Sequence, residues 1–353
     1  MKKYRIISKL FFVFALLWLT SCKEKEVINN ENVIAYNAPV EVKSKAQILA
    51  DEVFKNGEII NAELSPKIMS AEEVYHSLDK NILIIDTRGG KDFADGHIKN
   101  AVNVKMSELM DFAQVKGLPM YQKVVLVCYT GQTTSYSAAI LQLLGYKNIY
   151  VLEWGMCGWN KKFSDKWIKN ISDKYIKKLV TTPYPKNSPS ELPVIENKKN
   201  TGPQILNMRA RTILKEGFGG SAVTYRYAAG SAKKGKSYLI CYQPESVYNE
   251  GHIDNAILYD QKNSFNLSTD LLTLPTDKTI VIYSDKAYQS TFIMVYLKML
   301  GYDAKTVKYG VNSFMNSKSM ERGTGFSDSE IKNYPFETSE YIEVVGEVQE
   351  GGC

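Results

Sequence analysis

Cysteine is scarce in this sequence, and long apolar stretches are absent. Five cysteines in 353 residues do not form a disulfide-built scaffold. The apolar run from Leu10 to Leu19 is too short to serve as a stable bilayer-spanning helix. The formal charge of +6 falls to +2 once the four basic residues of positions 1–21 are removed, because that segment contains no acid. A nearly neutral protein gives no electrostatic reason to expect a nucleic-acid partner.

The first 21 residues have the pattern of a secretion signal, with a basic start followed by the short apolar run. They end in LTSC at 19–22, which resembles the lipobox of bacterial lipoproteins. That resemblance implies acylation of Cys22 and a membrane anchor through several acyl chains. An ordinary signal peptide with an incidental cysteine is the alternative. We expect an extracytoplasmic lipoprotein, with residues 22–45 as a polar tether.

What the sequence does contain is a diverged internal repeat. GHI at 96–98 recurs at 251–253, an offset of 155 residues. LLGY at 143–146 is matched by MLGY at 299–302, an offset of 156 residues. Paired landmarks at nearly one offset predict two copies of one fold.

Each copy alternates buried strands with helices. In the first, apolar runs at 82–85, 124–127 and 149–152 predict strands of a parallel sheet. Helical spacing after Cys128 ends at Gly145, a typical C-terminal residue of a helix. Strands that alternate with helices indicate an α/β fold in which each parallel sheet carries helices on both faces. Upstream, Ser70 and Glu73 form the sequence pattern of a capping box, which predicts a helix start.

The repeat sets the expected domain boundaries. The spacing of Trp167, Ile168, Ile171, Tyr175 and Leu179 predicts a helix between the copies, and residues 181–193 read as a Pro/Ser linker. The stretch 201–229 is ambiguous, since it also suits the start of the second domain. After the tether, we expect a first domain at 46–165, a linker with a helix at 166–229, a second domain at 230–335 and a flexible tail at 336–353.

The first copy, over about residues 66–165, resembles a rhodanese domain. The resemblance rests on an ordered set of motifs: IDTR, F-x-x-GHI, AVN, VLVCYTGQT, LLGY and L-x-x-GM-x-x-W. The second copy resembles a diverged rhodanese domain over about residues 230–320. The resemblance implies two rhodanese-like domains, the first of the active type. It also implies sulfur transfer through a cysteine persulfide.

The chemistry of the loop after residue 127 agrees with this resemblance. Cys128 follows a strand of a parallel sheet, where ligands bind in such folds. Gly131 allows the backbone N–H groups to curl inward as an anion-binding nest at a helix N-terminus. Such a nest would stabilise a thiolate or a persulfide and lower the pKa of the thiol. An inert buried cysteine is the alternative. The expected anion-binding residues of the loop are Tyr129, Thr130, Gly131, Gln132 and Thr133.

The loop lacks arginine, and this absence narrows its chemistry. The common C-x-x-G-x-R rhodanese pattern places arginine at position 133, where this sequence has Thr133. The C-x5-R phosphatase pattern places it at position 134, where this sequence has Thr134. Phosphate chemistry is therefore not expected, and strong thiosulfate binding is in doubt. A less charged donor, such as a polysulfide or a protein persulfide, suits the loop better.

Two neighbouring motifs have both structural and functional interpretations. Asp86 and Arg88 follow the first strand on the same rim as Cys128. In the functional interpretation, Arg88 adds positive potential at this rim. In the structural interpretation, which we favour, Asp86 and Arg88 form a network that holds the loops together. His97 of GHI is expected to be structural, because its counterpart His252 occurs in a copy without a nucleophile.

The second copy lacks the reactive group. Ser284 aligns with Cys128, Ala287 with Gly131, and Gln289 with Thr133. Cys241 and Gln243 occupy the positions of Asp86 and Arg88. A serine without a base is a poor nucleophile. The second domain is therefore expected to be catalytically silent.

Three other cysteines have weaker signals. Cys157 follows the strand at 149–152, on the sheet edge that carries Cys128. In one interpretation it resolves a Cys128 persulfide by forming a disulfide with Cys128. In the other it is an ordinary loop cysteine. Cys241 is expected in the core. Cys353 ends a glycine-containing tail and would either accept sulfur or be idle.

The sequence thus predicts a sulfurtransferase that passes a sulfane sulfur from a small donor or protein persulfide to a thiol acceptor. No metal or cofactor is expected. The alternatives are a non-catalytic binding or scaffold lipoprotein, and a thiol redox switch between Cys128 and Cys157.

Overall fold

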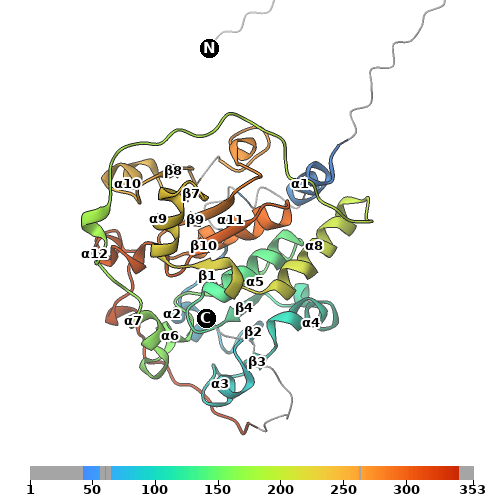
Figure 1. The fold of residues 1–353 in the computed structure, drawn as a ribbon. Coiled ribbons are helices and arrows are strands. Elements are labelled where there is room, and N and C mark those ends of the chain that lie inside the picture. Colours follow the sequence, from blue (N-terminus) through green and yellow to red (C-terminus); the bar gives the residue numbers. More distant parts are fainter. Residues whose placement is uncertain (1–42, 56–59, 61–64, 262–263, 342–353) are drawn as a thin grey trace, which may run out of the picture. The chain divides into compact units, whose positions relative to one another are not determined.

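Two parallel sheets with the same strand order form the framework of the protein (Figure 1). The computed structural model describes residues 43–55, 60, 65–261 and 264–341. The sheets have five strands each, in the orders β1-β5-β4-β2-β3 and β6-β10-β9-β7-β8. The predicted repeat of an α/β unit is confirmed. Cys22 and Cys353 lie outside the described residues.

The first sheet is built from the apolar runs that the sequence marks as strands. Its central strands are buried along almost their whole length, as is typical of a parallel sheet covered on both faces. The strands are β1 (Ile68–Met69), β2 (Ile82–Asp86), β3 (Val102–Asn103), β4 (Lys123–Val127) and β5 (Ile149–Leu152). The longer connecting helices are α2 (Ala71–Tyr75), α3 (Gly90–Ala94), α4 (Leu109–Lys116), α5 (Gln132–Leu143) and α6 (Met156–Trp159).

The predicted helix boundaries of this domain agree with the structure. Ser70 caps α2, and its side chain and that of Glu73 make both bonds of the capping box. The helix α5 ends at Leu143, and Gly145 follows with a φ of +98°, which suits glycine after a helix.

The second domain repeats this plan, beginning upstream of residue 230. Its strands are β6 (Ala222–Val223), β7 (Ser237–Cys241), β8 (Ala256–Leu258), β9 (Thr279–Tyr283) and β10 (Ala304–Val307). Its helices are α9 (Tyr225–Lys233), α10 (Glu245–Glu250), α11 (Tyr288–Met299) and α12 (Asn316–Glu321). The ambiguous stretch 201–229 therefore contains the helix α8 (Gly202–Glu216) and then the first strand of this sheet.

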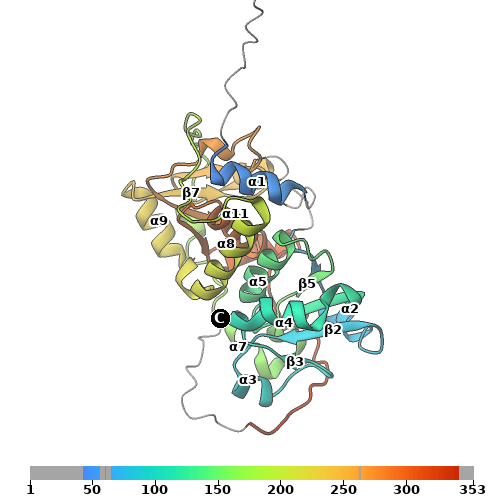
Figure 2. The ribbon, with the colours of Figure 1, turned by 90° about the vertical axis from the view of Figure 1, so that its right-hand side faces the viewer.

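The helices that follow the two central strands, α5 and α11, pack against each other (Figures 1 and 2). Every residue of α5 is buried, including the polar ones of its first turns. The helix α8 packs on both, and α1 (Lys45–Lys55) packs on α8. One continuous core cluster therefore includes residues of both domains, and buried contacts join the two domains.

The prediction of one helix from the spacing of Trp167 to Leu179 is wrong. Only α7 (Asp165–Ile168) and a 3₁₀ turn at Ile176–Lys178 form. The backbone instead bonds to the second domain, where Ser172 N–H donates to Asn312 O at 3.0 Å and Tyr175 N–H donates to Phe314 O at 3.3 Å. Separate tertiary contacts thus replace the ladder of bonds that a helix would make.

Each domain is followed by a segment that lies on the other domain. We call residues 164–180 the first crossing segment; it forms a bridge between Val180 and His252 of the second domain. Residues 326–341 are the second crossing segment, with a bridge between Glu337 and His97 of the first domain. The first six residues of the expected tail, 336–341, therefore belong to a packed segment.

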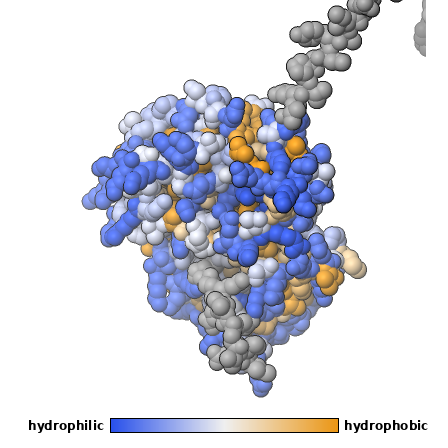
Figure 3. All heavy atoms as spheres, turned by 45° about the vertical axis from the view of Figure 1, so that its right-hand side comes forward, coloured by the Kyte–Doolittle hydropathy of each residue, from blue (hydrophilic) through white to orange (hydrophobic). Residues whose placement is uncertain are grey.

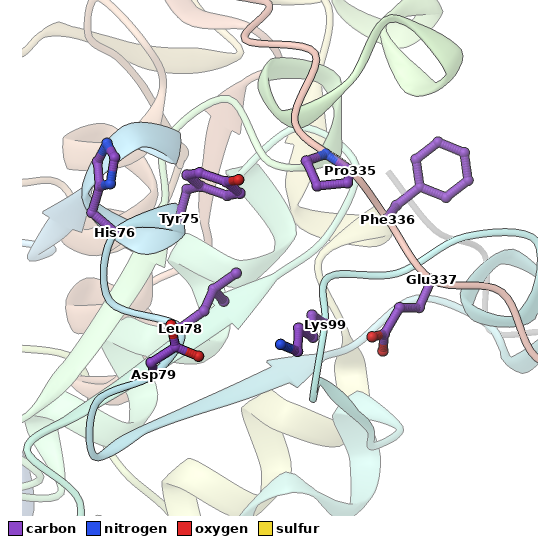
Figure 4. Close-up of a pocket in the computed structure, with 8 residues that line it drawn as sticks. All are labelled: Tyr75, His76, Leu78, Asp79, Lys99, Pro335, Phe336 and Glu337. Carbon is purple, nitrogen blue, oxygen red and sulfur yellow. The ribbon is translucent and has the colours of Figure 1, made fainter.

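The second crossing segment is held by specific contacts. The Trp159 indole donates to Pro335 O at 2.8 Å, and the Tyr334 ring stacks on Tyr75 at 4.2 Å. A cavity of about 440 Å³ remains between this segment and α2, with Lys99 and Glu337 among its lining residues (Figure 4). The surface view shows mostly hydrophilic residues, with the hydrophobic ones in small patches (Figure 3).

The residues that the structure describes contain no helix long and apolar enough to cross a membrane. They also contain no group of three His, Cys, Asp or Glu side chains arranged to hold a metal ion.

The two crossing segments meet at Phe326, which leads to a stability prediction. The ring of Phe326 is fully buried and lies 5.3 Å from Trp154 and 5.4 Å from Trp167 between ring centroids. Phe326→Ala should lower the free energy of unfolding by about 3–5 kcal/mol, because it opens a cavity among aromatic rings. Denaturant unfolding measures the loss. Val194→Ala, at a side chain that is 85% exposed, should change it by less than about 0.5 kcal/mol. A loss below about 1 kcal/mol for Phe326→Ala would contradict this packing.

Candidate active site around Cys128

Cys128 lies between the end of β4 and the start of α5, as the sequence predicts. Gly131 adopts a φ of +81° and caps α5, so the chain curls back toward the sulfur. Its N–H donates to Cys128 Sγ at 3.2 Å. The sulfur therefore sits at a helix N-terminus and accepts a backbone N–H, an arrangement that favours an anionic sulfur.

A second polar contact reaches the sulfur from Thr134, whose Oγ1 lies 3.4 Å from Cys128 Sγ. The same hydroxyl donates to Gly131 O at 3.2 Å. Thr134 is not among the site residues predicted from the sequence. The available signal is a hydroxyl residue at the same spacing in both copies, since Ser290 lies six residues after Ser284 as Thr134 does after Cys128. In the structure Ser290 contacts Ser284 Oγ at 3.1 Å.

The other loop side chains differ in their surroundings. Thr130 and Gln132 are buried, Thr133 is nearly so, and Tyr129 is half-buried. The Oγ1 of Thr130 accepts the N–H of Gln132 at 3.4 Å, which helps to fix the turn. The carbonyl oxygen of the Gln132 side chain accepts the N–H of Tyr309, from the second domain, at 2.7 Å. Gln132 thus connects the two domains.

Asp86 and Arg88 form a buried ion pair. The Arg88 Nη2 lies 2.6 Å from Asp86 Oδ2, and Arg88 Nε donates to both carboxylate oxygens. Burial lowers the pKa of Arg88, but the Asp86 carboxylate more than offsets this effect, so the pKa is raised. Arg88 Nη2 also donates to Gly96 O at 2.7 Å, which ties the rim loops together. The geometry agrees with the network interpretation that we favoured.

The Arg88 guanidinium lies against aromatic rings at the rim. It is 4.9 Å from the centroid of the Tyr129 ring and 5.5 Å from that of Phe163. Burial and the nearby Asp92 carboxylate raise the pKa of Tyr129 to about 12, although Arg88 acts in the opposite direction. The Tyr129 phenol is therefore protonated near neutral pH.

The two GHI histidines have equivalent structural contacts. His97 Nδ1 lies 2.8 Å from Phe93 O, and its ring stacks on the Phe93 ring. His252 Nδ1 lies 2.8 Å from Tyr248 O, with the same stacking on Tyr248. A structural role accounts for both residues.

Cys157 lies beside the Cys128 loop through its backbone. Its N–H donates to Tyr129 O at 2.9 Å, and the N–H of Met156 donates to Cys128 O at 2.9 Å. The Cys157 side chain is fully buried, and its Sγ donates to Phe163 O at 3.0 Å. A Cβ at Gly155 would lie 2.4 Å from Cys128 O, so only glycine permits this close approach.

Cys241 lies in the core of the second domain. It is fully buried, and burial raises the pKa of its thiol to about 12. A thiol in this environment is unreactive near neutral pH, as expected for a core residue.

The second domain covers the Cys128 loop with Tyr288. The buried Tyr288 hydroxyl donates to Thr130 O at 3.1 Å and accepts the N–H of Trp154 at 2.9 Å. A Cβ added at Gly131 would meet that hydroxyl at 2.8 Å. Nearby, Lys286 Nζ and Glu153 Oε1 form an ion pair at 2.5 Å. Cys128 is consequently only 3% exposed, a closure that sequence reasoning missed.

The loop of the second domain keeps the shape but not the thiol. Ser284 follows β9, and Ala287 has a φ of +66° where Gly131 has +81°. Ser284 Oγ accepts the N–H of Ser290 at 3.1 Å. The alignment of Ser284 with Cys128 therefore agrees with the fold.

Comparison with known proteins agrees with this architecture. The Rhodanese-like domain family matches residues 70–162 and 228–317, which together make up more than half of the chain. Thiosulfate sulfurtransferase GlpE of Shewanella oneidensis is 32% identical over 82 residues, which cover 23% of this chain and 79% of that protein.

A tRNA uridine(34) hydroxylase of Buchnera aphidicola is 26% identical over 163 residues, covering 45% of this chain. The chain spans about half the length of this relative, 49% of it. Among solved structures, a thiosulfate sulfurtransferase from Pseudomonas aeruginosa is 14% identical with a TM-score of 0.28, covering 83% of this chain and 49% of that chain. Because the family matches both copies, over the two units that form the sheets, the chain belongs to the rhodanese-like domain family.

Proposed function

We propose that the protein is a sulfurtransferase in which Cys128 carries a sulfane sulfur as a persulfide. One observation carries the proposal: Cys128 Sγ sits at the N-terminus of α5 and accepts the N–H of Gly131 at 3.2 Å. These donors favour a thiolate before transfer, and the same nest suits a persulfide anion after it.

The reaction has two steps of nucleophilic displacement at sulfur. The Cys128 thiolate attacks the outer sulfur of the donor, and the sulfur–sulfur bond of the donor breaks with its electron pair on the departing thiolate. An acceptor thiolate then attacks the outer sulfur of the Cys128 persulfide. The acceptor becomes a persulfide, and the Cys128 thiolate is regenerated.

The charges around the loop favour a donor of low charge. Thr133 stands where many rhodanese domains have arginine, and the nearby Arg88 is already paired with Asp86 at 2.6 Å. The Asp86 carboxylate neutralises the Arg88 guanidinium, although the buried Nη1 of Arg88 makes no hydrogen bond to the described residues. A dianion such as thiosulfate would therefore meet little net positive charge from these residues. A polysulfide or a protein persulfide fits better.

An intact-protein mass measurement tests the persulfide. After incubation with polysulfide, the protein should gain the mass of one sulfur atom, and a thiol should remove it. Cys128→Ser should abolish the gain, because neither of the other two cysteines that the structure describes, Cys157 and Cys241, begins a helix-capping loop of this kind. Cys241→Ser is the matched control and should keep it, since the Cys241 thiol is buried with a raised pKa. Thiosulfate should load Cys128 more slowly than polysulfide.

The outcomes of this measurement also distinguish the alternatives. A protein that gains no sulfur from polysulfide, thiosulfate or a persulfide donor is a non-catalytic binding module, an interpretation favoured by the nearly complete burial of Cys128. A redox switch requires Cys157. If Cys157→Ala turns over sulfur like the unchanged protein, that switch is excluded.

The burial of Cys128 requires an opening step, which Tyr288 should control. Tyr288→Phe removes a hydroxyl that makes two hydrogen bonds to the first domain. The free energy that favours the closed arrangement should fall by about 1–2 kcal/mol. Cys128 should therefore be alkylated roughly 5- to 30-fold faster. Tyr296→Phe is the control on the same helix, because its hydroxyl contacts Phe265 O within the second domain. Equal alkylation rates in both variants would show that Tyr288 does not hold the loop closed.

We do not extend the tRNA chemistry named for the Buchnera relative to this chain. The formal charge is +6, and four of the basic residues lie within the first 21. The net charge of +2 that remains gives no electrostatic argument for an RNA substrate.

We further propose that the chain is anchored to a membrane through acylated Cys22, on the basis of its basic leader and the LTSC motif. The protein produced in bacteria should partition into the detergent phase of a detergent–water separation, because several acyl chains hold it there. Cys22→Ala should move it to the aqueous phase, whereas Cys241→Ala should leave its partition unchanged. Detergent partition of the Cys22→Ala protein would rule out the anchor.

A further inference from the structure

A second cavity lies at the carboxyl end of the second sheet. It has a volume of about 540 Å³, and it is lined by residues that follow β6 and β10 and by the first crossing segment. The N-terminus of α9 opens onto it at Tyr225 and Arg226. Ligands of open parallel sheets bind at this end of the strands.

The charged residues that line this second cavity, which we call the basic cleft, are all positive. Its lining residues include Lys169, Lys174, Arg226 and Lys308, and no Asp or Glu. Lys169 is paired with Asp165 at 2.5 Å. Among the residues that the structure describes, Lys174, Arg226 and Lys308 make no ion pair.

Asp173 and Asp254 lie near residues of the cleft but do not line it. The carboxylate of Asp173 accepts the N–H of Ser317 at 2.8 Å. Asp254 contributes to the raised pKa of Tyr225, after burial and Tyr175, but it does not line the cleft. The positive field of the cleft is therefore not neutralised from within.

Two stacked aromatic rings form one side of the cleft. The rings of Tyr175 and Tyr225 lie 4.0 Å apart. Arg226 Nε donates to the Tyr175 hydroxyl at 2.7 Å, so this phenol orients the guanidinium. Within the described residues, this is the only hydrogen bond of that side chain, which leaves both terminal nitrogens available to a ligand. The hydrogen bond from Arg226 lowers the pKa of Tyr175; burial opposes this effect, and the charges of Arg226 and Lys174 reinforce it.

The cleft also borders the Cys128 loop. Tyr309 lines it, and the N–H of Tyr309 donates to Gln132 Oε1 of the loop at 2.7 Å. The Tyr309 ring packs edge-on against Trp167, whose indole donates to Thr130 O at 3.1 Å. One wall of the cleft is thus bonded to the first domain.

We propose that this cleft binds a small dianionic oxyanion, either inorganic or as the head of a small molecule, at a site separate from Cys128. Arg226 and Lys308 supply the main contacts, and the N-terminus of α9 adds backbone N–H groups. The ligand chemistry is that of sulfate, thiosulfate or phosphate. This site goes beyond the proposed sulfur transfer and does not require it.

The experiment measures binding to the Cys128→Ser protein, so that sulfur chemistry does not contribute. Sulfate, thiosulfate and inorganic phosphate are titrated separately by calorimetry at low ionic strength, because salt screens such contacts. At least one probe should bind saturably at one site per chain. Arg226→Gln combined with Lys308→Gln should weaken that binding at least tenfold, which corresponds to about 1.4 kcal/mol.

A charge-matched control separates a site from general attraction. Lys80→Gln combined with Lys116→Gln removes the same charge from exposed residues of the first domain and should leave binding within about twofold. Tighter binding of phosphate assigns the cleft to phosphorylated ligands, and tighter binding of thiosulfate or sulfate assigns it to sulfur oxyanions. Absence of saturable binding for all three probes would overturn the proposal, as would equal weakening in the two double variants. Neither result bears on the persulfide of Cys128, which is measured separately.

Discussion

The packing of α5 against α11 determines how the Cys128 loop is held. A helix that begins in a domain interface must have its first N–H groups and neighbouring carbonyls satisfied without water. Here the second domain supplies the partners: the Tyr288 hydroxyl bonds Thr130 O and Trp154 N–H, and Tyr309 N–H bonds the side chain of Gln132. The loop geometry in the first domain is therefore completed by the copy that lacks a nucleophile.

This dependence explains why the second copy keeps its shape. Ala287 holds the positive φ that glycine adopts in the first copy, at a steric cost that only surrounding contacts can offset. Beside it, Gln243 and Arg322 both donate to the Asp285 carboxylate, whose pKa is raised by burial despite Arg322. The second copy, which has Ser284 in place of the thiol, supports the neighbouring domain through Tyr288.

The sequence predicted the features that repeat or follow local rules. The strand ends, the capping box at Ser70 and the curl at Gly131 each depend on residues close together in the chain, so their patterns were visible. The closure by Tyr288 was not visible, because residues 130 and 288 carry no shared local pattern and meet only through the fold. The prediction of a helix from Trp167 to Leu179 was wrong for a related reason. The apolar residues have the spacing of a helix, but Trp167 packs in a cluster with Trp154 of the first domain, whereas Tyr175 and Leu179 pack on the core of the second domain.

The crossing segments give the chain a particular order of assembly. The Trp159 indole of the first domain donates to the carbonyl oxygen of Pro335, which lies 176 residues further along the chain. At ribosomal rates of about 5–20 residues per second, the first domain waits roughly 9–35 seconds for the segment that covers it. During that interval Tyr75 and Trp159 lack the contacts that Tyr334 and Pro335 make with them in the folded protein. Completion of the first domain is thus a late event in the biogenesis of this protein, after nearly all of the second domain has been made.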